Sequence, residues 1–171
     1  ENAPFCSNES YNKDGLISYP FLGIGHYLWD DNLGMAIFWG KKWYKGKYVI
    51  VEAELEIEYD FLFDLVANRS HMKRLTKYAY TLMKRKIIDE DWSVSEVIEH
   101  MKKVPDTRVF PFKIIRALQF KKDAKTYRFT LNRGTTINLN PCIIYCILET
   151  NYNKITNKRI IIKKPKKTKQ T

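Results

Sequence analysis

Apolar and polar residues alternate with two different periods along this chain, and each period predicts a different kind of element. Over residues 47–60 almost every second residue is apolar, which is typical of a strand with one buried face. Over residues 70–86 the apolar residues recur every three or four positions, which is typical of an amphipathic helix. The patterns therefore predict an α+β fold.

Three helices are predicted, each opened by a residue that can cap its N terminus: residues 33–43, 70–86 and 93–104. The second is expected to use Ser70 as its N-cap. The third opens with the capping box Ser93-Val-Ser-Glu96 and stops before Pro105.

Further strands are predicted at residues 126–133 and 141–149, with a strand-like stretch starting at Thr107 and an edge strand over residues 159–162. Residues 141–149 are apolar on both faces, which favours a central strand. Residues 110–120 fit either a strand or a short helix.

The length of the chain favours one folded domain with two polar ends. Residues 1–18 are expected to form a polar N-terminal loop, residues 19–162 the domain, and residues 163–171 a flexible basic tail. The chain has 171 residues and contains no apolar run long enough for a membrane span and no signal-peptide pattern, so a cytoplasmic protein without a membrane partner is expected.

The charge and the cysteine content limit the class of partner and the compartment but do not identify a function. The chain has 30 Lys and Arg and 19 Asp and Glu, and the net charge of +11 permits attraction to nucleic acid or to acidic surfaces. Three cysteines form no disulfide framework, and their odd number fits a reducing compartment. The histidines are scattered and no Cys-x-x-Cys occurs, so no metal site is expected.

The segment over residues 19–43 combines two glycines, an aromatic strand and a helix. Gly23 and Gly25 let the backbone turn tightly or approach a ligand, and Tyr27 follows with a ring available for stacking. The pattern also fits a hairpin followed by a packed helix, with no ligand. It is not a dinucleotide fingerprint, since the third glycine is missing.

Leu-Gly-Ile-Gly-His-Tyr-Leu-Trp-Asp, residues 22–30, resembles the glycine-x-glycine-x-tyrosine strand of the ADP-ribosyltransferase superfamily, in its poly-ADP-ribose polymerase and diphtheria-toxin branch. It is most similar to uncharacterised bacterial ADP-ribosyltransferase-like proteins, and the likeness extends over roughly residues 7–86. Leu28 replaces an aromatic residue and Asp30 a glutamate. The resemblance implies split antiparallel sheets with flanking helices, NAD as substrate, and a toxin, effector or defence protein.

The resemblance also implies roles for individual residues. Gly23, Gly25 and Tyr27 would bind NAD, with Tyr27 stacked on the nicotinamide, and Arg108 would bind a phosphate of NAD. The late strand of the family carries a catalytic Glu or Gln, but the matching position here is Cys142 or Ile144.

The only carboxylate of that predicted strand is Glu149, which is the catalytic candidate together with Tyr27. The family's first strand has no match before Tyr19, so the resemblance leaves it to a segment upstream of Glu1 or to a second chain.

Three functions remain open at this point. The first is transfer of ADP-ribose from NAD to a macromolecular target, protein or nucleic acid. The second is a catalytically inactive domain of the same family that binds a partner, which the replacement at Cys142 or Ile144 favours. The third is a basic nucleic-acid-binding domain, based on the net charge and on the basic tail over residues 163–171. The glutamates of residues 52–58 are expected to be a solvated row that pairs with lysines.

Overall fold

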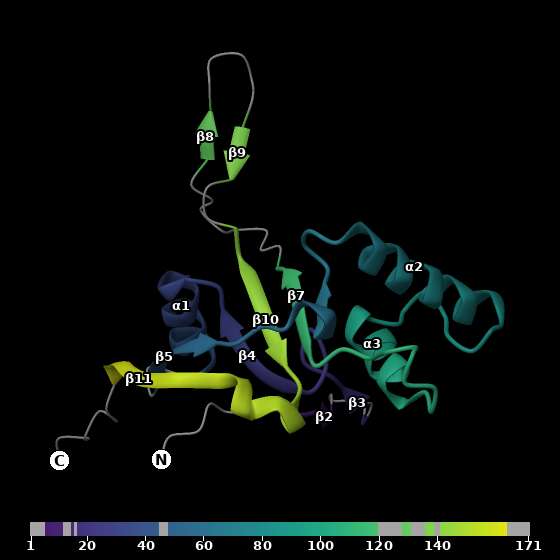
Figure 1. Cartoon of the computed structure of the whole chain (residues 1–171), viewed down its shortest axis with the longest axis horizontal. Helices are drawn as coiled ribbons and strands as arrows, with labels where there is room; N and C mark the ends of the chain where they lie inside the picture. Colours follow the sequence, from purple (N-terminus) through teal and green to yellow (C-terminus); the bar gives the residue numbers. More distant parts are fainter. Residues whose placement is uncertain are drawn as a thin grey trace. The chain divides into compact units, whose positions relative to one another are not determined.

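A computed structural model describes residues 6–11, 15, 17–44, 48–119, 128–130, 136–138 and 141–163 of the chain (Figure 1). The chain forms two compact units. One unit comprises Glu1–Leu28, Ile57–Ala117 and Tyr145–Tyr152, and the other comprises Trp29–Glu56, Leu118–Ile144 and Asn153–Thr171. Each unit is therefore assembled from three separate stretches of sequence.

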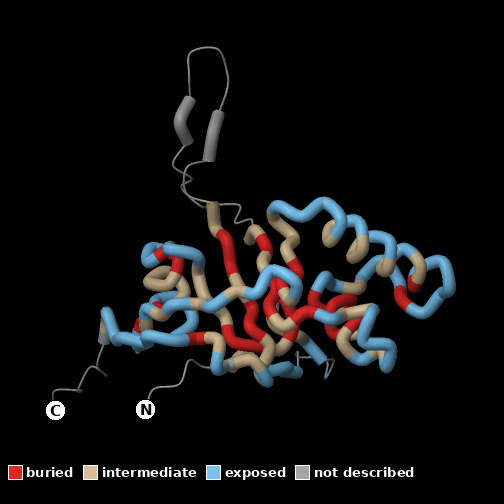
Figure 2. The backbone as a smooth tube through the Cα atoms, viewed as in Figure 1, coloured by how far each residue is buried: buried red, intermediate tan, exposed pale blue. Residues whose placement is uncertain are grey.

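The first unit holds most of a five-stranded sheet. Its strands, in spatial order, are β1 (Cys6–Ser7), β4 (Gly25–Trp29), β10 (Ile143–Ile147), β7 (Ile114–Leu118) and β6 (Leu62–Asp64). β10 is the middle strand, and four of its five residues are buried, which confirms the central strand predicted for residues 141–149. Figure 2 shows that the buried residues concentrate along these inner strands. The α+β class predicted from the sequence is confirmed.

Residues 1–18, predicted to be a loop, contribute short strands among their described residues. β1 pairs antiparallel with β4, and β2 (Ser10–Tyr11) pairs antiparallel with β3 (Ile17–Ser18). Each of these strands has only two residues, which is too few to show a hydrophobic periodicity. Each strand therefore depends on the strand with which it pairs.

Two helices of the first unit form a second layer of packing. α2 (Arg69–Lys84) and α3 (Val94–Lys103) enclose a cluster of the buried residues Leu82, Ile88, Val97 and Met101. The capping box predicted at Ser93 is present, and α3 ends just before Pro105 as expected.

The N-cap predicted for α2 is wrong by two residues. Asn68 caps the helix, and its Oδ1 accepts hydrogen bonds from the amides of Ser70 at 3.0 Å and His71 at 3.2 Å. An asparagine in extended backbone satisfies two of the unpaired amides of the first turn, which leaves Ser70 inside the helix.

The strand-like stretch predicted from Thr107 is also wrong. Residues 107–109 form a turn in which the Asp106 carboxylate accepts a hydrogen bond from the Arg108 amide at 3.0 Å. Such a local side-chain bond to the backbone competes with strand pairing. The strand of this region is β7, which resolves the ambiguity of residues 110–120 in favour of a strand.

β6 follows a short 3-10 helix, η1 (Tyr59–Phe61), and pairs parallel with β7.

The second unit contains α1 (Leu33–Trp43), β5 (Val49–Leu55), β8 (Arg128–Thr130), β9 (Thr136–Asn138) and β11 (Ile155–Lys163). α1 starts where predicted, because Asn32 Oδ1 accepts a hydrogen bond from the Met35 amide at 3.0 Å. A second 3-10 helix, η2 (Glu149–Lys154), precedes β11.

β5 and β11 pair antiparallel, and the glutamate row predicted to be solvated is exposed, but only one of its three partners is a lysine. Glu52, Glu54 and Glu56 are exposed on β5 and in the residue that follows it. They contact Arg159, Asn157 and Lys154, respectively. The carboxylates therefore form a solvated ladder with polar and basic partners, which is a surface feature.

Candidate functional site

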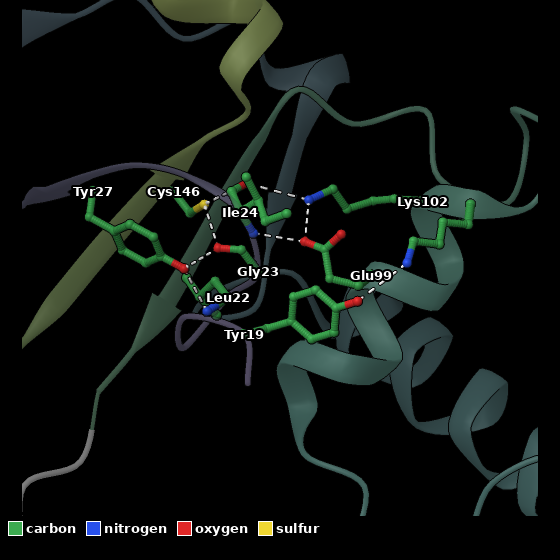
Figure 3. Close-up of polar contacts among 9 residues, drawn as sticks. Tyr19, Leu22, Gly23, Ile24, Tyr27, Glu99, Lys102 and Cys146 are labelled. Carbon is green, nitrogen blue, oxygen red and sulfur yellow. Dashed lines mark hydrogen bonds and ion pairs between the residues drawn. The ribbon is translucent and has the colours of Figure 1, made fainter. Parts of the chain in front are cut away.

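The candidate site is the glycine turn, defined here as residues 20–27, which lies within the first unit (Figure 3). The amide of Gly23 donates a hydrogen bond to the Pro20 carbonyl at 2.8 Å, which closes the turn and buries Leu22 completely. Gly23 has a φ of +90°, a conformation that residues with a Cβ rarely adopt. The first glycine of the motif is therefore required by the backbone itself.

Tyr27 is attached to this turn through its hydroxyl group. The Tyr27 hydroxyl donates to the Gly23 carbonyl at 2.6 Å and accepts from the Leu22 amide at 2.8 Å (Figure 3). Two backbone partners fix the ring in one orientation, and the residue as a whole is half-buried. The tyrosine predicted to face NAD thus stabilises the turn that carries the two glycines.

Glu99 of α3 reaches the same turn from the other side. Its Oε1 accepts a hydrogen bond from the Ile24 amide at 2.7 Å and pairs with Lys102 Nζ at 2.6 Å, while Lys102 Nζ donates to the Ile24 carbonyl at 3.4 Å. Glu99 is only 5% exposed. A Cβ on Gly23 would lie 2.2 Å from Glu99 Oε1, so a side chain at this position would require the Glu99 carboxylate to move.

Gly25 has a matching role toward β10. A Cβ on Gly25 would lie 2.6 Å from both Cys146 Sγ and the Ile147 carbonyl oxygen. The thiol of Cys146 is fully buried and lies 4.0 Å from the Gly23 carbonyl oxygen. The second glycine therefore allows β4 to approach β10 closely, with a thiol filling the space between them.

Burial keeps the Tyr27 phenol and the Cys146 thiol neutral. Burial, followed by the nearby Cys146 thiol, raises the pKa of Tyr27 far above its usual value. Burial likewise raises the pKa of Cys146 to about 12. A neutral phenol and a neutral thiol are poor bases and poor nucleophiles at physiological pH, so neither Tyr27 nor Cys146 is suited to proton abstraction or nucleophilic attack.

The late-strand candidates fall at three different places. Cys142 precedes β10 and is half-buried, and Ile144 is 4% exposed on β10 itself. Glu149 begins η2 after the last residue of β10, so the strand ends two residues earlier than predicted, and the Glu149 side chain lies outside the described part of the structure. Ile143–Ile147 contains no carboxylate.

Both neighbours of β4 in the sheet belong to this chain. β10 lies on one side, and β1 lies on the other, with Cys6 opposite His26 and Ser7 opposite Gly25. β4 is therefore flanked on both sides by strands of this chain, on the β1 side along two residues.

Arg108 is not among the residues that surround the glycine turn. Its guanidinium pairs with the Asp106 carboxylate, with Nη2 to Oδ2 at 2.9 Å, and the side chain is 88% exposed. It lines a cavity together with residues of α2, and the lining of that cavity includes no residue of the glycine turn. The structure thus brings together Gly23, Gly25 and Tyr27 but leaves Arg108 with a different set of side chains.

Sequence reasoning missed Glu99, Lys102 and Cys146, which complete the cluster around the glycine turn. Their spacing holds one signal, since Glu99 and Lys102 are three residues apart on a helix and can form a pair. Nothing in the pattern connects that pair to a turn 75 residues earlier.

Comparisons of the chain with protein-family models, with curated proteins and with solved structures gave no match. Among the described residues, the longest helices are too short and too polar to cross a membrane.

Proposed function

We propose that this chain is an ADP-ribosyltransferase-like domain that holds the nicotinamide end of NAD against Tyr27 and directs ADP-ribose to a macromolecular target. The proposal rests on the resemblance of residues 22–30 to that superfamily. The observation that carries it is the double hydrogen bond of the Tyr27 hydroxyl, to the Leu22 amide and the Gly23 carbonyl. A ring fixed in this way loses little further conformational freedom when a flat ligand stacks on it, which favours binding.

The chemistry of the proposed transfer is a substitution at the sugar carbon. A nucleophile of the target bonds to the ribose carbon while the bond to nicotinamide breaks, and the nicotinamide nitrogen keeps the electron pair. Positive charge develops on the ribose, as in glycoside cleavage. Tyr27 would position the leaving group, and Glu149 is the proposed carboxylate that favours the cationic sugar. Arg108 lies outside this site, in the lining of a separate cavity, so no contact to NAD is assigned to it in this proposal.

A binding domain without transfer activity is the second candidate, and a specific observation favours it. By the resemblance, the position of the superfamily's catalytic acid or amide is Cys142 or Ile144; Cys142 is half-buried before β10, Ile144 is buried on β10, and neither is an acid or an amide. Such a strand can support a binding surface but supplies no charge to a cationic sugar.

Calorimetry with NAD tests binding, with three variants beside the wild type. Tyr27→Leu removes the aromatic ring and is expected to weaken NAD binding about tenfold, given about 1–3 kcal/mol for a stacked ring. Tyr27→Phe keeps the ring and is expected to lose less. Tyr80→Leu, an exposed tyrosine of α2, serves as the matched control and is expected to change nothing. Circular dichroism establishes that each variant is folded, and wild-type protein without measurable NAD binding would refute the proposal.

Labelling with biotinylated NAD then separates the two candidates. Incorporation of label into protein or nucleic acid, lost in Glu149→Gln, supports transfer. NAD binding with no label in any fraction leaves only the binding domain.

A further inference from the structure

The cavity beside α2 is lined by more cationic than anionic side chains. It is an open depression of about 530 Å³ in the first unit and is lined by Arg74, Lys77, Tyr78, Thr81, Met101, Asp106, Arg108 and Val109. Three of these residues are cations and one is an acid. A volume of this size lies in the range of small-molecule sites in proteins.

Its cationic groups are held by the fold to different degrees. The Arg74 guanidinium donates a hydrogen bond to the Arg108 carbonyl and lies over the Phe112 ring, with its central carbon 5.3 Å from the ring centroid. Arg74 is thereby fixed by two partners, neither of which is an acid. Asp106 pairs with Arg108. Lys77 is exposed one helical turn beyond Lys73, on the same helix as Arg74.

The base of the cavity is apolar and rigid. Met101 is 1% exposed and belongs to the buried cluster between α2 and α3, against which Tyr78 and Val109 pack. The Tyr78 hydroxyl contacts His100 Nδ1 at 2.8 Å, which fixes the position of its ring. Aromatic and aliphatic groups at the base and guanidinium groups around them suit a ligand with a flat ring and an anionic group.

We propose that this cavity binds a nucleotide, with its phosphates on Arg74, Lys77 and Arg108 and its base over Tyr78, Met101 and Val109. Guanidinium groups make bidentate, charge-assisted hydrogen bonds to phosphate, and the Asp106 carboxylate offsets the charge of one of the three cations that line the cavity. The inference does not rest on the proposed NAD site, because no residue of the glycine turn lines this cavity.

Calorimetry with ATP, adenosine and inorganic pyrophosphate tests the proposal on the full chain. ATP is expected to bind tightest, because adenosine lacks the phosphates and pyrophosphate lacks the ring. ATP that does not bind at millimolar concentration, or adenosine or pyrophosphate that binds as tightly as ATP, would overturn the proposal. The loss of NAD binding expected in Tyr27→Leu does not depend on whether ATP binds in this cavity. Failure of the NAD proposal is therefore distinguishable from failure of the nucleotide proposal.

Two lysine variants on the same helix locate the binding. Lys77→Gln is expected to weaken ATP binding about tenfold, the effect of losing one charge-assisted hydrogen bond. Lys84→Gln removes the same charge from an exposed position of α2 outside the cavity and is expected to change the affinity less than about twofold. Equal losses in both variants would show nonspecific attraction to a basic helix and would overturn the assignment to the cavity.

Discussion

The carboxylate of Glu99 accepts a hydrogen bond from the backbone amide of Ile24 at 2.7 Å, across 75 residues of sequence. This contact joins α3 to the glycine turn. The Glu99 carboxylate occupies the space that a side chain at Gly23 would need, since a Cβ there would lie 2.2 Å from the same oxygen. Packing inside the first unit therefore explains the glycine motif as well as the binding of a ligand would.

Glu99→Gln is expected to lower the free energy of unfolding by about 2–3 kcal/mol. The variant keeps an acceptor for the Ile24 amide but leaves the Lys102 ammonium, whose side chain is 18% exposed, without its acid. Urea denaturation measures the change. Adding Lys102→Met is expected to restore part of the loss, and Asp106→Asn, which removes an exposed ion pair, is the control that should have no effect. A stable Glu99→Gln protein would contradict the role assigned to this pair.

Gly23→Ala is expected to destabilise the protein by about 3 kcal/mol, through backbone strain and the collision with Glu99. Gly15→Ala provides the comparison, because Gly15 also has a positive φ, +76°, but a Cβ there would meet nothing within 4 Å. That variant is expected to cost about 1 kcal/mol from strain alone. Thermal and urea unfolding measure both, and equal losses would mean that Glu99 moves aside without cost.

Sequence patterns predicted the elements that are long and periodic, and missed those set by distant partners. α3 and its capping box follow from local residue order, and β10 follows from a run of apolar residues on both faces. β1 has two residues and exists only because β4 lies beside it. The turn at Asp106 replaced a predicted strand because one carboxylate binds a nearby amide, a local effect that residue periodicity does not register.

The candidate site was predictable in part for the same reason. Gly23, Gly25 and Tyr27 lie within five residues of one another and were found as a motif. Their partners Glu99 and Cys146 come from segments 75 and 123 residues away from the turn, so no local pattern could identify them.

Alkaline pH is expected to destabilise the wild type more than Cys146→Ala. The folded protein raises the pKa of this thiol from 9.0 to about 12, so the stability that the neutral thiol contributes is complete below pH 9 and declines as the pH rises toward 12. The expected extra decline is about 1.4 kcal/mol per pH unit within that window. Urea denaturation from pH 7 to 11 under reducing conditions measures it. Parallel curves for the two proteins would contradict the burial of the thiol, since Cys6 and Cys142 are present in both.

Asn68→Ala is expected to lower the free energy of unfolding by about 1 kcal/mol, the usual effect of losing an N-cap. Ser70→Ala tests the alternative cap, and it is expected to leave stability unchanged because Ser70 lies inside the first turn of α2. Thermal unfolding of the two variants decides between them, and a larger loss in Ser70→Ala would reverse the assignment.

The interleaving of the two units has a consequence for how the chain can be made and cut. Each unit combines segments from the first third and the last third of the sequence, including Tyr145–Tyr152 for the first unit and Asn153–Thr171 for the second. During synthesis neither unit can close before these late segments emerge, so β4 must wait for β10 on the side away from β1, and β5 must wait for β11. A single cleavage before Tyr145 would remove a part of both units, and no contiguous fragment of the chain contains either one alone.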